Sequence, residues 1–185
     1  VVHDKACFEG VGMFDESLPV LEDWDLWIRM AEKYDFYHIK KVTCEFSWRE
    51  DGTSTTSNRA GEFARIRNLI YERYGKQIQG SYIPVSTIQQ KLVSIIILTW
   101  NALEYTKKCV HSIQNHTNYL HEIVFVDNAS TDGTVEYLRN LIKGHSNYKL
   151  IENQENRGFA AGNNQGVAAA SGEYVCLLNN DVLVS

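Results

Sequence analysis

Polar side chains that suit a charged ligand follow three apolar runs in the second half of the sequence. They are Thr99-Trp100-Asn101, Asp127-Asn128 and Asn179-Asn180-Asp181. Carboxylate oxygens suit hard divalent cations, and amide groups bind phosphate and hydroxyl groups. A single group of this kind has a second explanation, because Asp132 before Gly133-Thr134 is equally well placed to cap a helix. The three groups together favour a polar ligand site.

Two acidic residues, Glu22 and Asp23, lie at the start of a predicted helix in the first half. Helical spacing places Asp23 on the same face as the apolar Leu26, Trp27 and Met30. Glu22 is rotated from it by about 100°, so Asp23 is the more inward of the two acids. The alternative is that both acids only complement the positive end of a helix.

These groups need a sheet whose strands end at one edge, and residues 91–185 predict one. Short, nearly continuous apolar runs alternate with helical patterns, as in parallel sheets covered on both faces. The predicted strands are 93–98, 122–126, 148–151 and 174–178, and the predicted helices are 102–115, 134–142 and 159–170. Ligands bind beyond the carboxyl ends of such strands. The expected fold class is α/β, with a Rossmann-like, mostly parallel sheet.

Residues 1–77 follow a different pattern and form the first of two predicted parts. Helices are expected over 3–10, 22–34 and 60–74, strands over 36–39 and 42–48, and a Ser/Thr-rich loop over 51–57. Pro84 marks a linker over 78–90, before the second part at 91–185. Trp24 and Trp27 are candidates for an aromatic ligand-binding platform, although core packing is the more usual role for Trp27.

Three glycines in the second half are spaced G-x-x-x-G-x-x-x-G, at Gly158, Gly162 and Gly166. The dinucleotide motif G-x-G-x-x-G is therefore absent, which argues against a dehydrogenase. A nucleotidyltransferase has an α/β sheet similar to the one predicted here, but it needs a glycine-rich, basic phosphate-binding loop after the first strand. Residues 99–102 offer no such loop.

Composition narrows the partners. The 185 residues carry 18 Lys+Arg against 23 Asp+Glu, a net charge of −5, which argues against nucleic acid as the main partner. No apolar stretch approaches the ~20 residues of a membrane span. The four cysteines are widely separated and indicate reduced thiols in a cytoplasmic protein. The sequence lacks an initiator Met and stops just after an apolar run, so we expect a piece of a larger polypeptide.

Four motifs of the second half resemble the nucleotide-sugar-binding half of glycosyltransferase family 2, which has the GT-A fold. They are S-I-I-I-L-T-W-N (94–101), V-D-N-A-S-T-D-G-T (126–134), N-R-G-F-A-A-G-N-N-Q-G (156–166) and L-L-N-N-D-V (177–182), in the family's order. The resemblance implies that Asp181 binds a divalent metal, Mn²⁺ or Mg²⁺, on the donor diphosphate. Asn179 replaces the first Asp of the family's D-x-D site. The nucleotide-binding residues implied are Thr99, Trp100, Asn101, Asp127, Asn128, Asn156, Gly158, Asn164 and Asn179, with Asp127 suited to accept a hydrogen bond from a uracil N–H.

The first half resembles the C-terminal half of the same family. F-E-G-V-G-M-F-D-E (8–16) is similar to F-x-x-V-G-G-F-D-E, and E-D-W-D-L (22–26) is similar to the E-D-x-D-L motif that supplies the catalytic base. The resemblance therefore implies that Asp23 or Glu22 takes the proton of an attacking hydroxyl, and helical spacing favours Asp23. The order of the halves is thus reversed. Tandem transferase domains and a permuted domain both explain this, and tandem domains are favoured because the family's middle segment has no counterpart here.

Apolar faces on both halves lead us to expect docking, within one chain or by exchange in a homodimer, so that Asp23 approaches Asp181. The resemblance implies an inverting glycosyltransferase acting on a UDP-linked nucleotide-sugar donor and a saccharide acceptor. The implied setting is cell-surface polysaccharide synthesis, with a cytoplasmic domain in a membrane-associated parent protein. The alternative from another class is a non-catalytic nucleotide-binding or interaction module.

Overall fold

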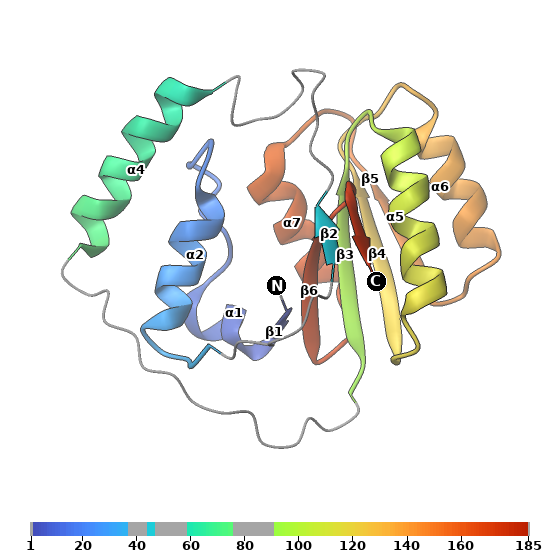
Figure 1. Ribbon diagram of the computed structural model, residues 1–185, viewed down its shortest axis with the longest axis horizontal. Coiled ribbons are helices and arrows are strands. Elements are labelled where there is room, and N and C mark those ends of the chain that lie inside the picture. Colours follow the sequence, from blue (N-terminus) through green and yellow to red (C-terminus); the bar gives the residue numbers. More distant parts are fainter. Residues whose placement is uncertain (1, 37–43, 47–58, 76–90, 185) are drawn as a thin grey trace. The chain divides into compact units, whose positions relative to one another are not determined.

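The computed structural model describes residues 2–36, 44–46, 59–75 and 91–184 (Figure 1). They divide into two compact units. The sheet unit comprises residues 1–6, 41–47 and 89–185, and the helical unit comprises residues 7–40 and 48–88. The loop expected over 51–57, the linker expected over 78–90 and most of the strand expected over 36–39 lie outside the described residues.

Four parallel strands form the centre of the sheet unit: β3 (Val93–Thr99), β4 (His121–Asp127), β5 (Tyr148–Glu152) and β6 (Tyr174–Asn179). Their spatial order is β6-β3-β4-β5. All four were predicted from their apolar runs, which suit strands buried on both faces. The expected α/β class with a mostly parallel sheet is confirmed.

Two short strands from the first part of the sequence complete the sheet unit. Strand β1 (Val2–Asp4) pairs antiparallel with β6, and β2 (Cys44–Phe46) pairs antiparallel with β7 (Val182–Val184). The helix expected over 3–10 is wrong at its start, because His3 and Asp4 lie in β1 and helix α1 begins at Ala6. A three-residue strand that pairs with a segment far along the chain leaves no local periodicity to read.

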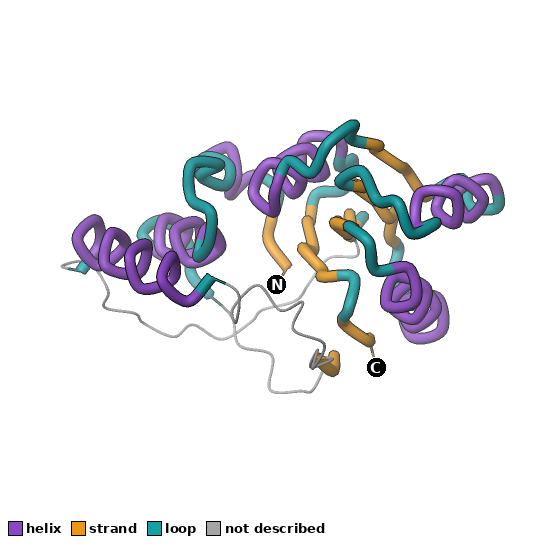
Figure 2. Tube along the Cα trace, turned by 90° about the horizontal axis from the view of Figure 1, so that it is seen from above, coloured by secondary structure: helices purple, strands orange, loops and turns teal. Residues whose placement is uncertain are grey.

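Helices cover both faces of the parallel strands (Figure 2). On one face, α5 (Leu103–His116) and α6 (Thr134–Lys143) pack over a core that includes Ile97 and Phe125. On the other face, α7 (Gly158–Ala169) packs over β3 and β4. This two-sided burial explains the runs of consecutive apolar residues in β3 (95–98) and β4 (123–126).

The glycine spacing of α7 has a packing cause. A Cβ atom at Gly162 would lie 2.3 Å from Leu98 Cδ1, and one at Gly166 would lie 2.2 Å from Ile96 Cγ2. Neither distance is sterically possible, so the two glycines allow α7 to approach the sheet closely. The first glycine, Gly158, begins the helix with a φ of +82°.

The helical unit contains α1 (Ala6–Val11), α2 (Glu22–Ala31) and α4 (Ala60–Tyr74). Its buried core is formed by Leu18, Val20, Ile66 and Ile70. Helix α4 has its predicted bounds, whereas α2 ends at Ala31 instead of Tyr34, because the N–H groups of Lys33 and Tyr34 both donate to the Met30 carbonyl and close a turn. None of the helices in the described ranges has the length and apolar character needed to cross a membrane.

Candidate functional site

The buried carboxylate of Asp127 joins the ends of β3 and β4. Its Oδ2 accepts hydrogen bonds from Thr99 Oγ1 at 2.7 Å and Ser130 Oγ at 2.6 Å, and its Oδ1 accepts one from Ser130 N at 2.7 Å. The Asp127 side chain is fully buried. These hydrogen bonds offset the cost of burying a carboxylate and close the turn that follows β4. Within this turn Ala129 has a φ of +61°, which is unusual for a residue with a side chain.

Asn101 ties the loop after β3 to the loop after β4. It has a φ of +44°, a conformation that asparagine tolerates better than most residues. Its Oδ1 accepts a 2.7 Å hydrogen bond from Thr131 N, and its own N–H donates to Ser130 Oγ at 2.9 Å. The neighbouring Trp100 is 55 % exposed. Hydrogen bonds therefore hold the loop after β3 in place, and this loop exposes the side chain of Trp100 to solvent.

Asp132 caps two helices, as the alternative interpretation of its position predicted. Its Oδ1 accepts hydrogen bonds from the N–H and hydroxyl of Thr134, and its Oδ2 accepts one from Leu103 N at 2.9 Å. These groups begin α6 and α5. Burial alone would raise the pKa of Asp132, but the hydrogen bonds outweigh it and hold the pKa below its ordinary value.

Amide side chains extend this arrangement toward the start of α7. Asn128 Nδ2 donates to Asn156 Oδ1 and to the Gly158 carbonyl, both at 3.1 Å, and Asn128 Oδ1 accepts a 2.8 Å hydrogen bond from Asn153 Nδ2. Asn153 also exchanges two hydrogen bonds with Gln165, at 2.8 and 2.9 Å. We call the connected set the strand-end network. It consists of Thr99, Asn101, Asp127, Asn128, Ser130, Thr131, Asn153, Asn156 and Gln165.

Four members of the strand-end network were not predicted as site residues. Ser130, Thr131 and Gln165 lie inside motifs that had been recognised, so the motifs carried the signal. Asn153 lies outside every motif, directly after β5. Its place after a strand was the one available indication, because polar residues that follow parallel strands gather at one edge.

The third polar group follows β6 at the same edge of the sheet. Asn179 is the register neighbour of Leu98, just as Asp127 is that of Thr99. The expectation that Asn101, Asp127 and Asp181 follow strand ends at one edge is therefore met.

The turn after β6 lies against α5. Asn180 Nδ2 donates to Thr106 Oγ1 at 3.1 Å. Burial raises the pKa of Cys109 to about 12, and the nearby Asp181 carboxylate adds to this effect. Asp181 is half-buried and Asn179 is exposed, while Asn164 on α7 is half-buried.

Asp181 suits a divalent cation as one ligand among several. Within the described ranges, no three His, Cys, Asp or Glu side chains are grouped to hold a metal ion. A carboxylate on an accessible turn is nevertheless a hard oxygen ligand of the kind that Mn²⁺ and Mg²⁺ bind, with other ligands coming from phosphate oxygens and water.

Among the described residues of the helical unit, the most deeply buried acid is Asp25. It is 1 % exposed and accepts hydrogen bonds from Arg29 Nε at 2.9 Å and Tyr74 Oη at 2.8 Å. Arg29 also donates to the carbonyls of Val11 and Met13, at 2.6 and 2.9 Å. Asp25 and Arg29 thus fasten α2 to α4 and to the end of α1.

Helical spacing placed Asp23 on the inward face, but the inward carboxylate is that of Asp25. Asp23 is half-buried, and its Oδ1 accepts a 2.9 Å hydrogen bond from Trp24 N. Burial raises the pKa of Asp23, and burial also raises that of Glu22, with repulsion from Asp23 adding to it. A raised pKa makes a carboxylate a stronger proton acceptor as long as it is ionised. Trp27 is half-buried rather than in the core.

Comparison with known proteins identifies the second part of the chain. Residues 94–185 match the family model described as glycosyl transferase family 2. These residues belong to glycosyl transferase family 2. The match spans β3 to β7, and so includes the strand-end network and Asp181.

Several curated relatives are similar to the chain. It is 30 % identical over 203 residues to the uncharacterized protein y4gI of Sinorhizobium fredii, covering 99 % of this chain and 22 % of that protein. It is 24 % identical over 208 residues to an uncharacterized glycosyltransferase of Rickettsia bellii, covering 95 % and 30 %. Residues amounting to 49 % of the chain are 34 % identical to 36 % of TuaG of Bacillus subtilis, a putative teichuronic acid biosynthesis glycosyltransferase. The chain thus spans about a fifth to a third of these relatives.

Among solved structures, the chain is similar to the mannosyltransferase PcManGT from Pyrobaculum calidifontis, which was determined in complex with GDP-Man and Mn²⁺. The likeness covers 66 % of this chain and 37 % of that one, at 27 % identity and a TM-score of 0.49.

Proposed function

We propose that this chain is part of a glycosyltransferase that takes a sugar from a nucleotide-sugar donor and passes it to a saccharide acceptor. The observation that carries the proposal is the coincidence of two features in residues 94–185. These residues belong to glycosyl transferase family 2, and their strand-end network gathers polar groups at the carboxyl edge of a parallel sheet. Ligands of open α/β sheets bind at this edge.

The nucleotide of the proposed donor is UDP, and it lies over the strand-end network. Trp100 offers an exposed aromatic face on which a base can stack. Thr99, Asn101, Asn128, Asn156, Gly158 and Asn164 shape the pocket. The fully buried Asp127 holds the loops in place, and a hydrogen bond from a uracil N–H to its carboxylate requires the turn at Ser130 to open.

The diphosphate of the donor lies near Asn179 and Asp181 in this proposal. Asp181 holds a divalent cation, Mn²⁺ or Mg²⁺, as its one charged protein ligand. When bound, such a cation neutralises the charge that develops on the departing diphosphate. Asn179 contributes an exposed amide for hydrogen bonding to the donor.

The helical unit supplies the base for an acceptor hydroxyl. The acceptor oxygen attacks the anomeric carbon, the bond to the diphosphate breaks, and the hydroxyl proton passes to Asp23. A single displacement of this kind inverts the anomeric configuration. The raised pKa of Asp23 suits a base, and Glu22, whose pKa is raised as well, is the second candidate.

The order of the two parts is proposed to reflect tandem transferase domains. The relatives from Sinorhizobium and Rickettsia align with 99 % and 95 % of this chain, although they are several times longer. Alignment over nearly the whole chain supports the proposal that an acceptor-type part precedes a nucleotide-binding part within longer polypeptides. The setting in polysaccharide synthesis is supported by the name of TuaG, and cytoplasmic nucleotide sugars would be the donor pool.

Release of UDP from a panel of UDP-sugars tests the proposal. The wild-type chain is compared with Asp181→Asn and Asp23→Asn, with Mn²⁺ present, and with and without an oligosaccharide acceptor. The proposal expects Asp181→Asn to abolish UDP release, and Asp23→Asn to reduce acceptor-dependent release by at least tenfold. Nucleotide binding without turnover would favour a non-catalytic module, and pyrophosphate release from UTP with a sugar phosphate would favour a nucleotidyltransferase.

A further inference from the structure

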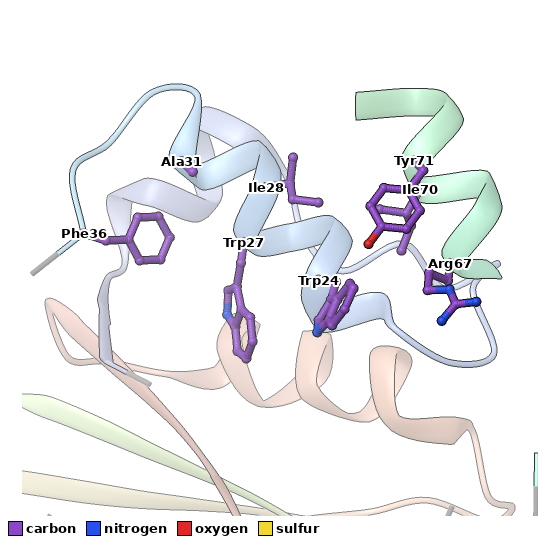
Figure 3. A pocket seen from close by; sticks show the side chains of 8 residues that line it. All are labelled: Trp24, Trp27, Ile28, Ala31, Phe36, Arg67, Ile70 and Tyr71. Atoms are coloured by element: carbon purple, nitrogen blue, oxygen red, sulfur yellow. The ribbon is translucent and has the colours of Figure 1, made fainter. Parts of the chain in front are cut away.

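An aromatic groove of about 420 Å³ lies between α2 and α4 in the helical unit (Figure 3). Trp24 and Trp27 project from the same side of α2, and Arg67, Ile70 and Tyr71 line it from α4. Their positions at i, i+3 and i+4 place each set on one helical face. The volume is in the range of small-ligand sites.

Three large aromatic side chains that line the groove are exposed. Trp24 is 42 % exposed, Tyr71 is 54 % exposed and Phe36, which also lines the groove, is 43 % exposed. Such surface is costly, at roughly 25 cal/mol per Å². Exposed apolar patches that are concave commonly mark a binding site.

Arg67 gives the groove its charge. Within the described ranges, Arg29, Arg59, Arg73 and Arg139 each pair with a carboxylate. Arg67 forms no ion pair or hydrogen bond with any described residue, and no acidic side chain lines the groove. In Figure 3 its guanidinium lies at the end of the groove nearest Trp24. An unmatched guanidinium beside aromatic rings selects a planar anion, which it binds with two parallel hydrogen bonds.

We propose that this groove binds an anionic saccharide. The apolar C–H face of a sugar ring stacks on Trp24 and Tyr71, and a carboxylate or phosphate of the saccharide pairs with Arg67. The combination of flat aromatic faces with a single cation fits a sugar ring better than a peptide helix, whose side chains need a row of aliphatic pockets. The inference deepens the proposed function, on which its biological role rests, by naming the acceptor as acidic.

Calorimetric titration of the whole chain with three matched trisaccharides tests this inference. The probes are maltotriose, maltotriose oxidised at C6 to the uronic acid, and maltotriose phosphate. We expect at least one anionic probe to bind about tenfold more tightly than maltotriose, the value for one charge-assisted hydrogen-bonded pair. The two anionic arms distinguish a carboxylate from a phosphate ligand. Preference for the anion should weaken as the salt concentration rises.

Variants of α4 and α2 assign the binding to the groove. Arg67→Gln should remove the preference for the anionic probe, and Trp24→Ala should weaken all binding by about tenfold. Arg65→Gln is the matched control, because Arg65 is an exposed arginine of the same helix that does not line the groove. It should leave binding unchanged. Arg67→Lys should retain part of the preference for the anionic probe. Circular dichroism checks that each variant keeps its helices.

Equal affinity for all three probes, no binding at millimolar concentration, or equal effects of Arg67→Gln and Arg65→Gln would each overturn the inference. Binding of an acidic amphipathic peptide in preference to the saccharides would overturn it as well. UDP binding is measured on the same samples. If UDP still binds while the saccharides do not, the groove inference fails and the proposed function stands.

Discussion

The hydroxyl of Thr99 donates a 2.7 Å hydrogen bond to Asp127 Oδ2, and both side chains are fully buried. Thr99 and Asp127 are register partners at the ends of two neighbouring parallel strands. The bond therefore lies where the sheet stops and the candidate site begins. The hydrogen bond between Asn101 and Thr131 joins the loops that follow these two strand ends.

Asp127→Asn should weaken the sheet unit. An amide nitrogen in place of one oxygen cannot accept the hydrogen bonds that Thr99 and Ser130 donate. Leaving these buried groups unsatisfied costs about 1–3 kcal/mol. Urea unfolding followed by the NMR amide signals of β3 and β4 measures the change. The same substitution at the exposed Asp35 is the control, and an equal effect of the two variants would contradict the assigned role.

Gly162→Ala and Gly166→Ala should each lower the unfolding free energy of the sheet unit by about 1–3 kcal/mol, because the added methyl group overlaps Leu98 or Ile96. Gly61→Ala provides a contrast. A Cβ atom at Gly61 meets nothing within 4 Å, and the residue lies in α4, so alanine should be neutral or stabilise the helical unit by up to about 1 kcal/mol. Thermal unfolding of all three variants tests both signs. A tolerated alanine at Gly162 would show that α7 does not need close approach.

The stability of the sheet unit should fall in acid through Glu122. Burial alone would raise the pKa of Glu122, but hydrogen bonds from Ser94, Ser171 and Lys149 outweigh it and hold the pKa below its ordinary value of 4.5. The unfolded chain then binds the proton more tightly than the folded one. The stabilisation is therefore complete above pH 4.5 and is lost as the pH falls through the lower folded-state pKa.

Unfolding measured from about pH 3 to about pH 7 checks this dependence, because the range includes the ordinary pKa of a glutamate. Glu122→Gln should flatten the acid limb of the curve. Glu104→Gln is the control, since Glu104 pairs with Lys107 at a largely exposed position and should leave the limb unchanged. An unaltered acid limb in Glu122→Gln would exclude Glu122 as its source.

His3→Pro should free the edge of β6. His3 pairs with Val175, and proline cannot donate the backbone hydrogen bond of a strand ladder. An unpaired edge strand promotes association between chains, so light scattering should detect a rise in apparent mass with protein concentration. His3→Val, which suits a strand, should behave as wild type.

Our expectation that the unmodified chain is compact or dimeric stays a prediction, and an expanded wild-type monomer in the same experiment would contradict it.

The sequence predicted the centre of the sheet well because β3 and β4 carry runs of consecutive buried apolar residues, and β5 and β6 continue the same alternation of strands and helices. It failed for β1, whose three residues owe their conformation to pairing with β6 rather than to local preference. It also favoured an inward Asp23, whereas Asp25 is the buried acid. The burial of Asp25 depends on hydrogen bonds from Tyr74 and Arg29, and spacing within one helix cannot reveal the contact with Tyr74.

The candidate site was predictable to the extent that it lies in motifs. Thr99, Asn101, Asp127 and Asn128 were identified because they follow strands. Asn153 was not, because its role depends on contacts with Asn128 and Gln165 from other elements. The sequence predicted only part of the aromatic groove. Trp24 was singled out, but nothing in the sequence placed Arg67 of α4 in the same groove.

Calorimetric titration with UDP in the presence and absence of Mn²⁺ tests the central claim most directly. The wild-type chain should bind UDP more tightly with Mn²⁺ than without it. In the presence of Mn²⁺, Asp181→Asn should bind UDP about tenfold or more weakly than wild type. Asp35→Asn should bind it as wild type does. UDP binding that is absent, or that responds to Mn²⁺ equally in wild type and Asp181→Asn, would contradict a nucleotide-sugar site at this edge of the sheet.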